Sequence, residues 1–253
     1  DVRFLSPAQA TQLEPALAAL QPALAGAIFT GGEAVADCRA FCLSLARLLQ
    51  SHPRYQGTLH GDAHGWRIAA GKLVALETSL GPQQADQFVL AAGIQSRDLA
   101  ARAGLQLPLY PLKGYSLSAP VRPSDLAPSI SVTDFERKTL YARIGDQLRI
   151  AAMVDLVGER PAIDPRRIAS LLRTARAAMP RAAAYEHAIP WSGLRPATPD
   201  GAPIIGATSV PNLWLNVGHG PLGFTFSCGS ASLLAGMMQG RPAPFALDDL
   251  ILR

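Results

Sequence analysis

Arg195 is the residue whose neighbours best suit it to bind an anion. It lies between Gly193 and Pro196, just ahead of a turn at Pro199-Asp200-Gly201, and such flanking residues hold the backbone on a stiff segment. A guanidinium group can donate two parallel hydrogen bonds to a carboxylate. We therefore predict that Arg195 binds an acid group, with a surface ion pair as the alternative.

A glycine-rich turn forms the second candidate site. The apolar run Leu213–Val217 predicts a strand, Gly218, Gly220 and Gly223 follow it, and a helix is expected at about Gly229–Met238. Glycines at a strand-to-helix turn let the backbone approach a ligand closely, and a helix N-terminus offers unpaired N–H groups and partial positive charge. An anionic or electron-rich ring is the natural ligand of such a turn.

The histidines and cysteines give little support for a metal site or a disulfide. Three histidines lie close together in sequence, but their spacing is irregular and no cysteine or carboxylate cluster accompanies them, so no metal site is expected at His52, His60 and His64. The three cysteines form an odd set without metal-ligand spacing, which favours free thiols and a reducing compartment. Cys38 and Cys42 are expected to be core residues of a helix, and Cys228 is the third.

Composition narrows the class of protein. Of the 253 residues, 49% are hydrophobic and 17% are charged, and the net charge is +4 with lysine and arginine scattered along the chain. A nucleic-acid partner is therefore not expected, and no apolar run reaches the ~18 residues of a membrane span. The low charge suits a chain that buries surface against a partner or a further segment; an ordinary alanine-rich protein is the alternative.

The elements that would position these residues alternate between helices and short strands. Hydrophobic spacing and turn residues predict helices at Pro7–Leu13, Ala34–Leu49 and Pro165–Met179. The apolar stripe of the second helix is Phe41, Leu45, Leu48 and Leu49. Strands are expected at Trp66–Ala69, Leu73–Glu77, Phe88 to about Gly93, Ile130–Thr133, Lys138–Ile144, Gln147–Leu156 and Tyr185–Pro190, with extended chain at Leu107–Pro120.

Two long segments carry a family resemblance. GLRPATPDGAPIIG (193–206) and NLWLNVGHGPLGFTFSCGS (212–230) closely resemble the C-terminal part of bacterial FAD-dependent D-amino acid dehydrogenases, members of the wider D-amino acid oxidase and glycine oxidase group. Weaker similarity covers LYPLKGYSLSAP (109–120) and YARIGDQLRIAAMVDLVG (141–158). The opening strand, G-x-G-x-x-G turn and helix with which the family holds the FAD pyrophosphate are not found ahead of these segments. The resemblance therefore implies that an N-terminal FAD-binding segment or another subunit supplies them.

The resemblance also implies a fold and a domain arrangement. The expected fold class is α+β/α/β, of the D-amino acid oxidase type, with part of a Rossmann-like FAD domain and an antiparallel-sheet substrate domain. The domains would be a helical part packing on the FAD domain (1–50), part of the FAD domain (51–105), the substrate domain (106–190) and a return to the FAD domain with a C-terminal helix (191–253).

Specific site residues follow from the resemblance. Arg195 would bind the substrate carboxylate with help from Tyr141 and Tyr115, although a core aromatic is an equal alternative for Tyr141. Lys113 would support the negative charge of reduced flavin, with a solvated lysine as the alternative, and His219 would contact the ring or shape the turn. The expected cofactor-binding set is Ala92, Gly93, Lys113, Gly114, Gly218, His219, Gly220, Leu222, Gly223, Phe224 and Thr225. The relatives usually carry a glycine pair where Ala151-Ala152 stand, which puts the close packing there in doubt.

The implied activity is oxidative deamination of D-amino acids such as D-alanine to 2-oxo acids and ammonia. Hydride transfer to FAD carries the difficult step, so no acid or base residue is assigned. The resemblance suggests that electrons leave to a quinone or respiratory carrier, and that the protein is cytoplasmic and associates peripherally with the inner face of the cytoplasmic membrane. The alternatives are a subunit of a heteromeric opine, proline or glycine dehydrogenase, and a non-catalytic fragment that binds a partner without working FAD.

Overall fold

The computed structural model describes residues 2–160 and 162–252 and divides into two compact units. Unit 1 comprises residues 1–49, 113–155 and 160–193, and unit 2 comprises residues 50–112, 156–159 and 194–253. The chain therefore passes from one unit to the other several times. The functional assignment of the expected domains stays a prediction, and each unit is described by itself below.

A five-stranded sheet is built from β6 (Tyr110–Pro120), β7 (Val132–Asp134), β8 (Thr139–Ile144), β9 (Gln147–Asp155) and β10 (Ile189–Ala197), in the order β10-β6-β9-β8-β7. The pairs β6–β9, β7–β8 and β8–β9 are antiparallel. A two-residue turn at Gly145 joins β8 to β9, because Ile144 pairs with Gln147 and Gly145 takes the positive φ of 62° that the turn requires. The predicted meander is confirmed.

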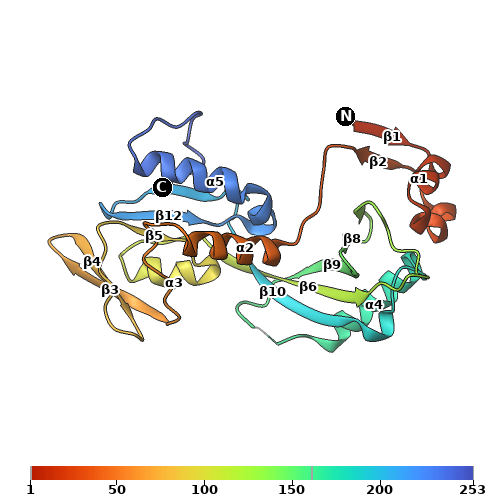
Figure 1. Ribbon diagram of the computed structural model, residues 1–253, viewed down its shortest axis with the longest axis horizontal. Coiled ribbons are helices and arrows are strands. Elements are labelled where there is room, and N and C mark those ends of the chain that lie inside the picture. The colour runs from red at the N-terminus through yellow and green to blue at the C-terminus, as the bar shows by residue number, and fades with distance from the viewer. Residues whose placement is uncertain (1, 161, 253) are drawn as a thin grey trace. The chain divides into compact units, whose positions relative to one another are not determined.

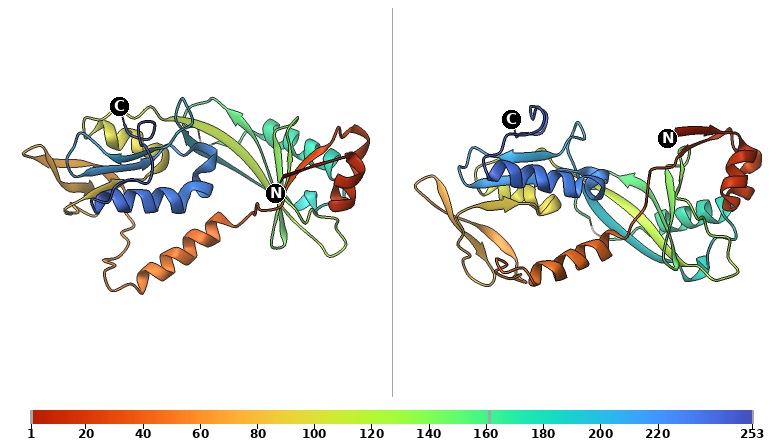
Figure 2. Two further views of the ribbon diagram at one scale, coloured as in Figure 1. Left: turned by 90° about the horizontal axis from the view of Figure 1, so that it is seen from above. Right: turned by 45° about the horizontal axis from the view of Figure 1, so that its top comes forward.

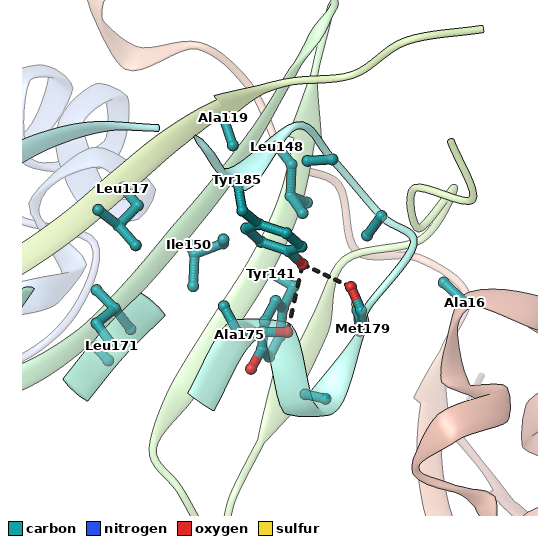
Figure 3. Packing of buried hydrophobic residues seen from close by; sticks show 14 of the residues in the cluster. Ala16, Leu117, Ala119, Tyr141, Leu148, Ile150, Leu171, Ala175, Met179 and Tyr185 are labelled. Atoms are coloured by element: carbon teal, nitrogen blue, oxygen red, sulfur yellow. Dashed lines mark hydrogen bonds between the residues drawn. The ribbon is translucent and has the colours of Figure 1, made fainter. Parts of the chain in front are cut away.

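Helix α4 (Pro165–Ala178) covers one face of this sheet. Asp164 caps it by accepting a hydrogen bond from the Arg166 backbone N–H at 2.8 Å. Its apolar side, with Leu171 and Ala175, packs on the sheet residues of the same core, and the Tyr185 hydroxyl donates to the Met179 carbonyl at 2.7 Å (Figure 3). The predicted helix is confirmed. The strand expected at Tyr185–Pro190 is not, because residues 185–187 form a 3-10 turn before β10 begins.

The first residues belong to the same core. A hairpin-like pair, β1 (Val2–Leu5) and β2 (Ala27–Thr30), flanks α1 (Pro7–Leu13) and two 3-10 turns at Pro15–Ala19 and Gln21–Ala23. Ser6 and Gln9 form a capping box at the start of α1, and the predicted helix at Pro7–Leu13 is confirmed. Ala10, Ala16 and Leu17 are buried with Tyr141. Helix α1 therefore packs within unit 1, and the expected packing of residues 1–50 on the FAD domain stays a prediction.

Helix α2 (Cys38–Gln50) begins four residues later than expected, since Asp37 accepts a hydrogen bond from the Ala40 N–H at 2.9 Å and so starts the helix there. No residue of α2 is buried. Its apolar stripe is 39–67% exposed, at Phe41, Leu45, Leu48 and Leu49. Cys38 and Cys42 are exposed too, so the prediction that they are core residues is wrong.

Unit 2 contains a three-stranded sheet in the order β11-β12-β5, made of Ile204–Ala207, Leu213–Val217 and Phe88–Leu90. Strand β12 is antiparallel to β11 and parallel to β5. Figures 1 and 2 show α3 (Ser96–Ala101) on one face of the sheet and α5 (Gly223–Met238) on the other. Helix α5 begins six residues before the expected start, so Gly229 lies inside it. The hairpin β3–β4 (Ala63–Ala69, Lys72–Thr78) is confirmed.

Candidate cofactor and substrate site

The parallel strands β5 and β12 bring two predicted cofactor segments to one edge of the unit 2 sheet. Because Leu90 pairs with Leu215 in parallel register, the chain leaves both strands in the same direction. Ala92-Gly93 follows the first strand and Gly218 follows the second. Ligands of open α/β sheets bind at the carboxyl ends of parallel strands, so this edge is the place where the fold favours a cofactor.

Positions 218 and 220 of the turn are suited to glycine for two different physical reasons. Gly218 has φ +80°, and a Cβ there would lie 2.8 Å from Thr198 Cγ2 and 3.2 Å from Leu109 Cδ2, so both conformation and packing exclude a side chain. Gly220 has φ +52° with nothing within 4 Å of a Cβ position, which leaves its backbone open to a ligand. The turn is tight on its inner side and open on its outer side.

Helix α5 begins directly after this turn. It is 16 residues long, no side chain caps its N-terminus, and its first turn carries no acidic residue. Leu222, Phe224 and Thr225 are exposed around this end of the helix. The unpaired N–H groups and the positive end of the helix dipole therefore remain available for an electron-rich group.

Arg195 and His219 lie on the same side of neighbouring backbone segments within unit 2. Ala197, near the end of β10, forms an antiparallel bridge with His219. Residues two apart on a strand share a face, so the side chain of Arg195 extends on the side of Ala197 and His219. Diagonal neighbours across such a pair are about 7–8 Å apart, within reach of long side chains. The predicted carboxylate clamp therefore borders the predicted flavin turn.

Burial affects the charge of both side chains. Burial lowers the pKa of Arg195, which stays protonated because an arginine pKa lies so far above neutral pH. Burial also lowers the pKa of His219 below its ordinary 6.5, so that the neutral ring is favoured at pH 7. The Nε2 atom of His219 is shielded from solvent and has no hydrogen-bond partner among residues 2–160 and 162–252.

The predicted site residues of β6 lie in unit 1. Lys113 is 2% exposed, its Nζ donates to the Ala162 carbonyl, and it lies 5.3 Å from the ring centre of Tyr115. The alternative of a solvated lysine is therefore wrong. Tyr115 is also buried, and burial together with a hydrogen bond to Asp155 raises the pKa of its phenol. Both side chains have partners within the protein, and their cofactor and substrate roles stay predictions.

Gly114 sits at a β-bulge. Lys113 pairs with Asp155 and Tyr115 with Ala152, so Gly114 alone faces Met153 and Val154 of β9. Met153 takes a φ of +72°, a strained conformation for a residue with a side chain. The irregularity directly follows Ala151-Ala152, the pair at which a glycine pair is expected in the relatives.

Tyr141 occupies the core. It is fully buried, on the sheet face that packs against α4, and Figure 3 shows it beside Tyr185 and Ala175. Burial raises its pKa to about 12, and its hydroxyl has no hydrogen-bond partner within the described part of the chain. This position fits the alternative of a core aromatic, and we do not carry Tyr141 into the substrate site.

Sequence reasoning missed two features of the site. The Ala197–His219 bridge joins segments far apart in sequence, and no local pattern signals it. Asn216, on β12, has a buried Oδ1 without a partner among the described residues, and a single polar residue in an apolar strand was the available signal. Among the same residues, no group of three or more metal-ligating side chains is found, and no helix has the length and apolar character to cross a membrane.

The comparisons with known proteins identify the family of this chain. The family model described as FAD dependent oxidoreductase (DAO) matches residues 1–237, and the chain therefore belongs to this family. D-amino acid dehydrogenase 2 of Pseudomonas aeruginosa is 47% identical over 93% of this chain, and D-amino acid dehydrogenase of Paramagnetospirillum magneticum is 41% identical over 97%. Each alignment covers 58% of the relative, so the chain spans a little over half the length of these proteins.

Solved structures confirm the fold. Glycine oxidase of Geobacillus kaustophilus matches all of this chain and 67% of its own, with TM-score 0.88 and 26% identity. Iminodiacetate oxidase of Chelativorans sp. BNC1 matches 99% of this chain and 67% of its own, with TM-score 0.83 and 25% identity. The expected D-amino acid oxidase type of fold, and FAD as the cofactor of the family, are thereby confirmed.

The residues at the sheet edge fit the ring end of FAD. The open backbone at Gly220 allows close approach of a flat ring, and the uncapped start of α5 favours the negative charge of a reduced flavin. The buried Nε2 of His219 lacks a partner that a bound molecule could provide.

Proposed function

We propose that this chain forms the substrate-binding and flavin-ring-binding part of a D-amino acid dehydrogenase. The proximity of Arg195 to the glycine-rich turn, fixed by the Ala197–His219 bridge, carries the proposal. The names of its relatives support a D-amino acid as the substrate. The proposed reaction converts the amino acid to an imine, which water hydrolyses to a 2-oxo acid and ammonia.

The protein residues would bind and orient the substrate. FAD, when bound, accepts the hydride from Cα. Arg195 would hold the carboxylate through paired hydrogen bonds and so fix the position of Cα over the turn at residues 218–225. The positive end of α5 would stabilise the negative charge that develops during hydride transfer.

The proposal extends to partners. No G-x-G-x-x-G turn lies ahead of the Arg195 segment, and the chain covers 58% of its relatives. Both observations support an FAD-binding segment or another subunit as the source of the pyrophosphate site. The name dehydrogenase, shared by these relatives, supports a quinone or respiratory carrier as the electron acceptor. A cytoplasmic protein on the inner face of the membrane would fit that acceptor.

Substitution of Arg195 tests the proposal. In the FAD-bound protein, Arg195→Leu should lower kcat/KM for D-alanine by about 100-fold or more, because a charged, paired hydrogen bond to the carboxylate is lost. Bound flavin should remain, and the matched control Arg173→Leu, on the exposed side of α4, should leave kcat/KM within about twofold. Loss of flavin with unchanged activity per flavin would refute the assigned role.

A further inference from the structure

His219 presents a buried nitrogen that the described protein does not satisfy. Its Nε2 is shielded from solvent and lacks a hydrogen-bond partner among residues 2–160 and 162–252. Buried polar atoms without partners are unfavourable and rare in native proteins. The atom therefore indicates a hydrogen-bonding group that comes from outside these residues.

The neutral form of the ring allows Nε2 to act as a hydrogen-bond acceptor. Burial is the cause that lowers the pKa of His219, so the imidazole is neutral at pH 7 and one of its nitrogens accepts a hydrogen bond. A ligand that meets Nε2 as acceptor must bring an N–H or O–H.

The neighbourhood of Arg195 supplies the second constraint. His219 bridges Ala197, and the Arg195 side chain extends on the same side two residues earlier. A ligand whose carboxylate binds Arg195 would therefore place a group on its adjacent carbon close to the imidazole. In an α-amino acid that group is the amino nitrogen, which carries the required N–H.

We propose that Nε2 of His219 accepts a hydrogen bond from the α-amino group of the substrate while Arg195 holds its carboxylate. This inference rests on the proposed function and adds the residue that recognises the amine. Two attachment points fix two of the four substituents of Cα. The remaining two substituents are the hydrogen and the side chain, and in only one enantiomer does the hydrogen face the flavin. The two contacts therefore give a physical basis for selecting one enantiomer.

A pair of unreactive ligands isolates the amine contact. 2-Aminoisobutyrate has no hydrogen on Cα and cannot be oxidised, and isobutyrate has the same carbon skeleton and carboxylate without the amino group. Affinities for the FAD-bound protein are measured from changes in flavin absorbance. We expect the wild type to bind 2-aminoisobutyrate more tightly than isobutyrate. In His219→Leu the ratio of the two affinities should fall by about 10- to 100-fold, with the affinity for isobutyrate unchanged.

Two further variants serve as controls. His219→Gln retains an acceptor oxygen and should recover part of the preference, which a purely structural role of the ring would not give. His187→Leu, at an exposed histidine of unit 1, should bind both ligands as the wild type does. Circular dichroism and bound FAD verify that each variant is folded.

Several results would overturn the inference: no preference for the amine in the wild type, full preference in His219→Leu, an equal loss for both ligands, or loss of FAD. These outcomes differ from failure of the proposed function. A wild type that binds 2-aminoisobutyrate through His219 but does not oxidise D-alanine would refute the reaction and leave the amine contact standing.

Discussion

The hydroxyl of Tyr141 is the least satisfied group in the core of unit 1. The side chain is fully buried among apolar neighbours. Its oxygen has no hydrogen-bond partner in the described ranges. Burying a hydroxyl without a partner costs about 1–3 kcal/mol. A tyrosine at this position therefore weakens the core locally, although its ring fills the space between the sheet and α4.

Tyr141→Phe should raise the free energy of unfolding by about 1 kcal/mol at pH 7, because the uncompensated hydroxyl is removed and the ring is kept. The pH dependence is the sharper test. Burial raises the pKa of Tyr141 from 10.0 to about 12, so above pH 10 the unfolded chain releases the proton and the folded chain keeps it. The free energy of unfolding should therefore fall by about 2–3 kcal/mol between pH 10 and pH 12. The Tyr141→Phe variant should not show this decrease.

Urea unfolding at pH 7 and at several values above pH 10 checks this prediction. Tyr185, whose pKa burial also raises, titrates in both proteins, so the difference between wild type and variant isolates Tyr141. Weaker binding of D-alanine or isobutyrate by the variant, with an unchanged fold, would instead return Tyr141 to the substrate site.

At the scale of elements, Glu14 joins the N-terminal turns to the loop before β7. Glu14 is 4% exposed. Its carboxylate accepts hydrogen bonds from Ser129 N at 2.7 Å, Ser129 Oγ at 2.9 Å and Ile130 N at 3.0 Å. A further bond comes from Ala16 N at 3.1 Å. One side chain thus satisfies backbone donors of two segments that are more than a hundred residues apart.

Glu14→Ala should destabilise the protein by about 2–4 kcal/mol, because several partly buried N–H groups lose their acceptor at once. Chemical denaturation measures the change, and Glu33→Ala, at an exposed glutamate, should stay within about 0.5 kcal/mol. A loss of less than 1 kcal/mol at Glu14 would show that water replaces the carboxylate easily.

Local sequence signals predicted most elements, because turns and caps are short-range chemistry. Gly145 marks the β8–β9 turn, Ser6 and Asp164 cap helices, and β5 and β12 are short, largely apolar runs. Helix α5 starts before the expected residue because the small residues around Gly229 are tolerated inside it. The 3-10 turn at Tyr185 was not predicted, because a three-residue turn has no periodicity to detect.

The site was predictable only in its local parts. The glycine turn and Arg195 each carry a recognisable pattern, whereas the bridge that joins them pairs residues distant in sequence. The two-residue period of β8 shows which residues share a face with Tyr141 but not which face α4 covers. Tertiary packing decided that question and placed the tyrosine in the core.

At the scale of the whole molecule, the residues assigned to FAD in the proposed function all concern the ring end of the cofactor. The turn at residues 218–225, which is proposed for the ring, contains the single G-x-G-x-x-G of the sequence, at Gly218, Gly220 and Gly223, and no second such turn is left for the pyrophosphate. The chain also covers 58% of the P. aeruginosa relative, and α2 exposes its entire apolar stripe. Both observations suggest that cofactor retention requires protein beyond these residues.

A polypeptide of residues 1–253 produced alone should therefore retain much less than one FAD per chain after gel filtration, because the contacts to the pyrophosphate are missing and ring contacts alone give weak binding. Absorbance near 450 nm against protein concentration measures the ratio. Production together with the part of the P. aeruginosa relative that this chain does not match should raise the ratio, and Arg195→Leu should not change it. One FAD retained per chain by the polypeptide alone would contradict this prediction. The described residues would then hold the whole cofactor, and the pyrophosphate would bind without a second glycine-rich turn.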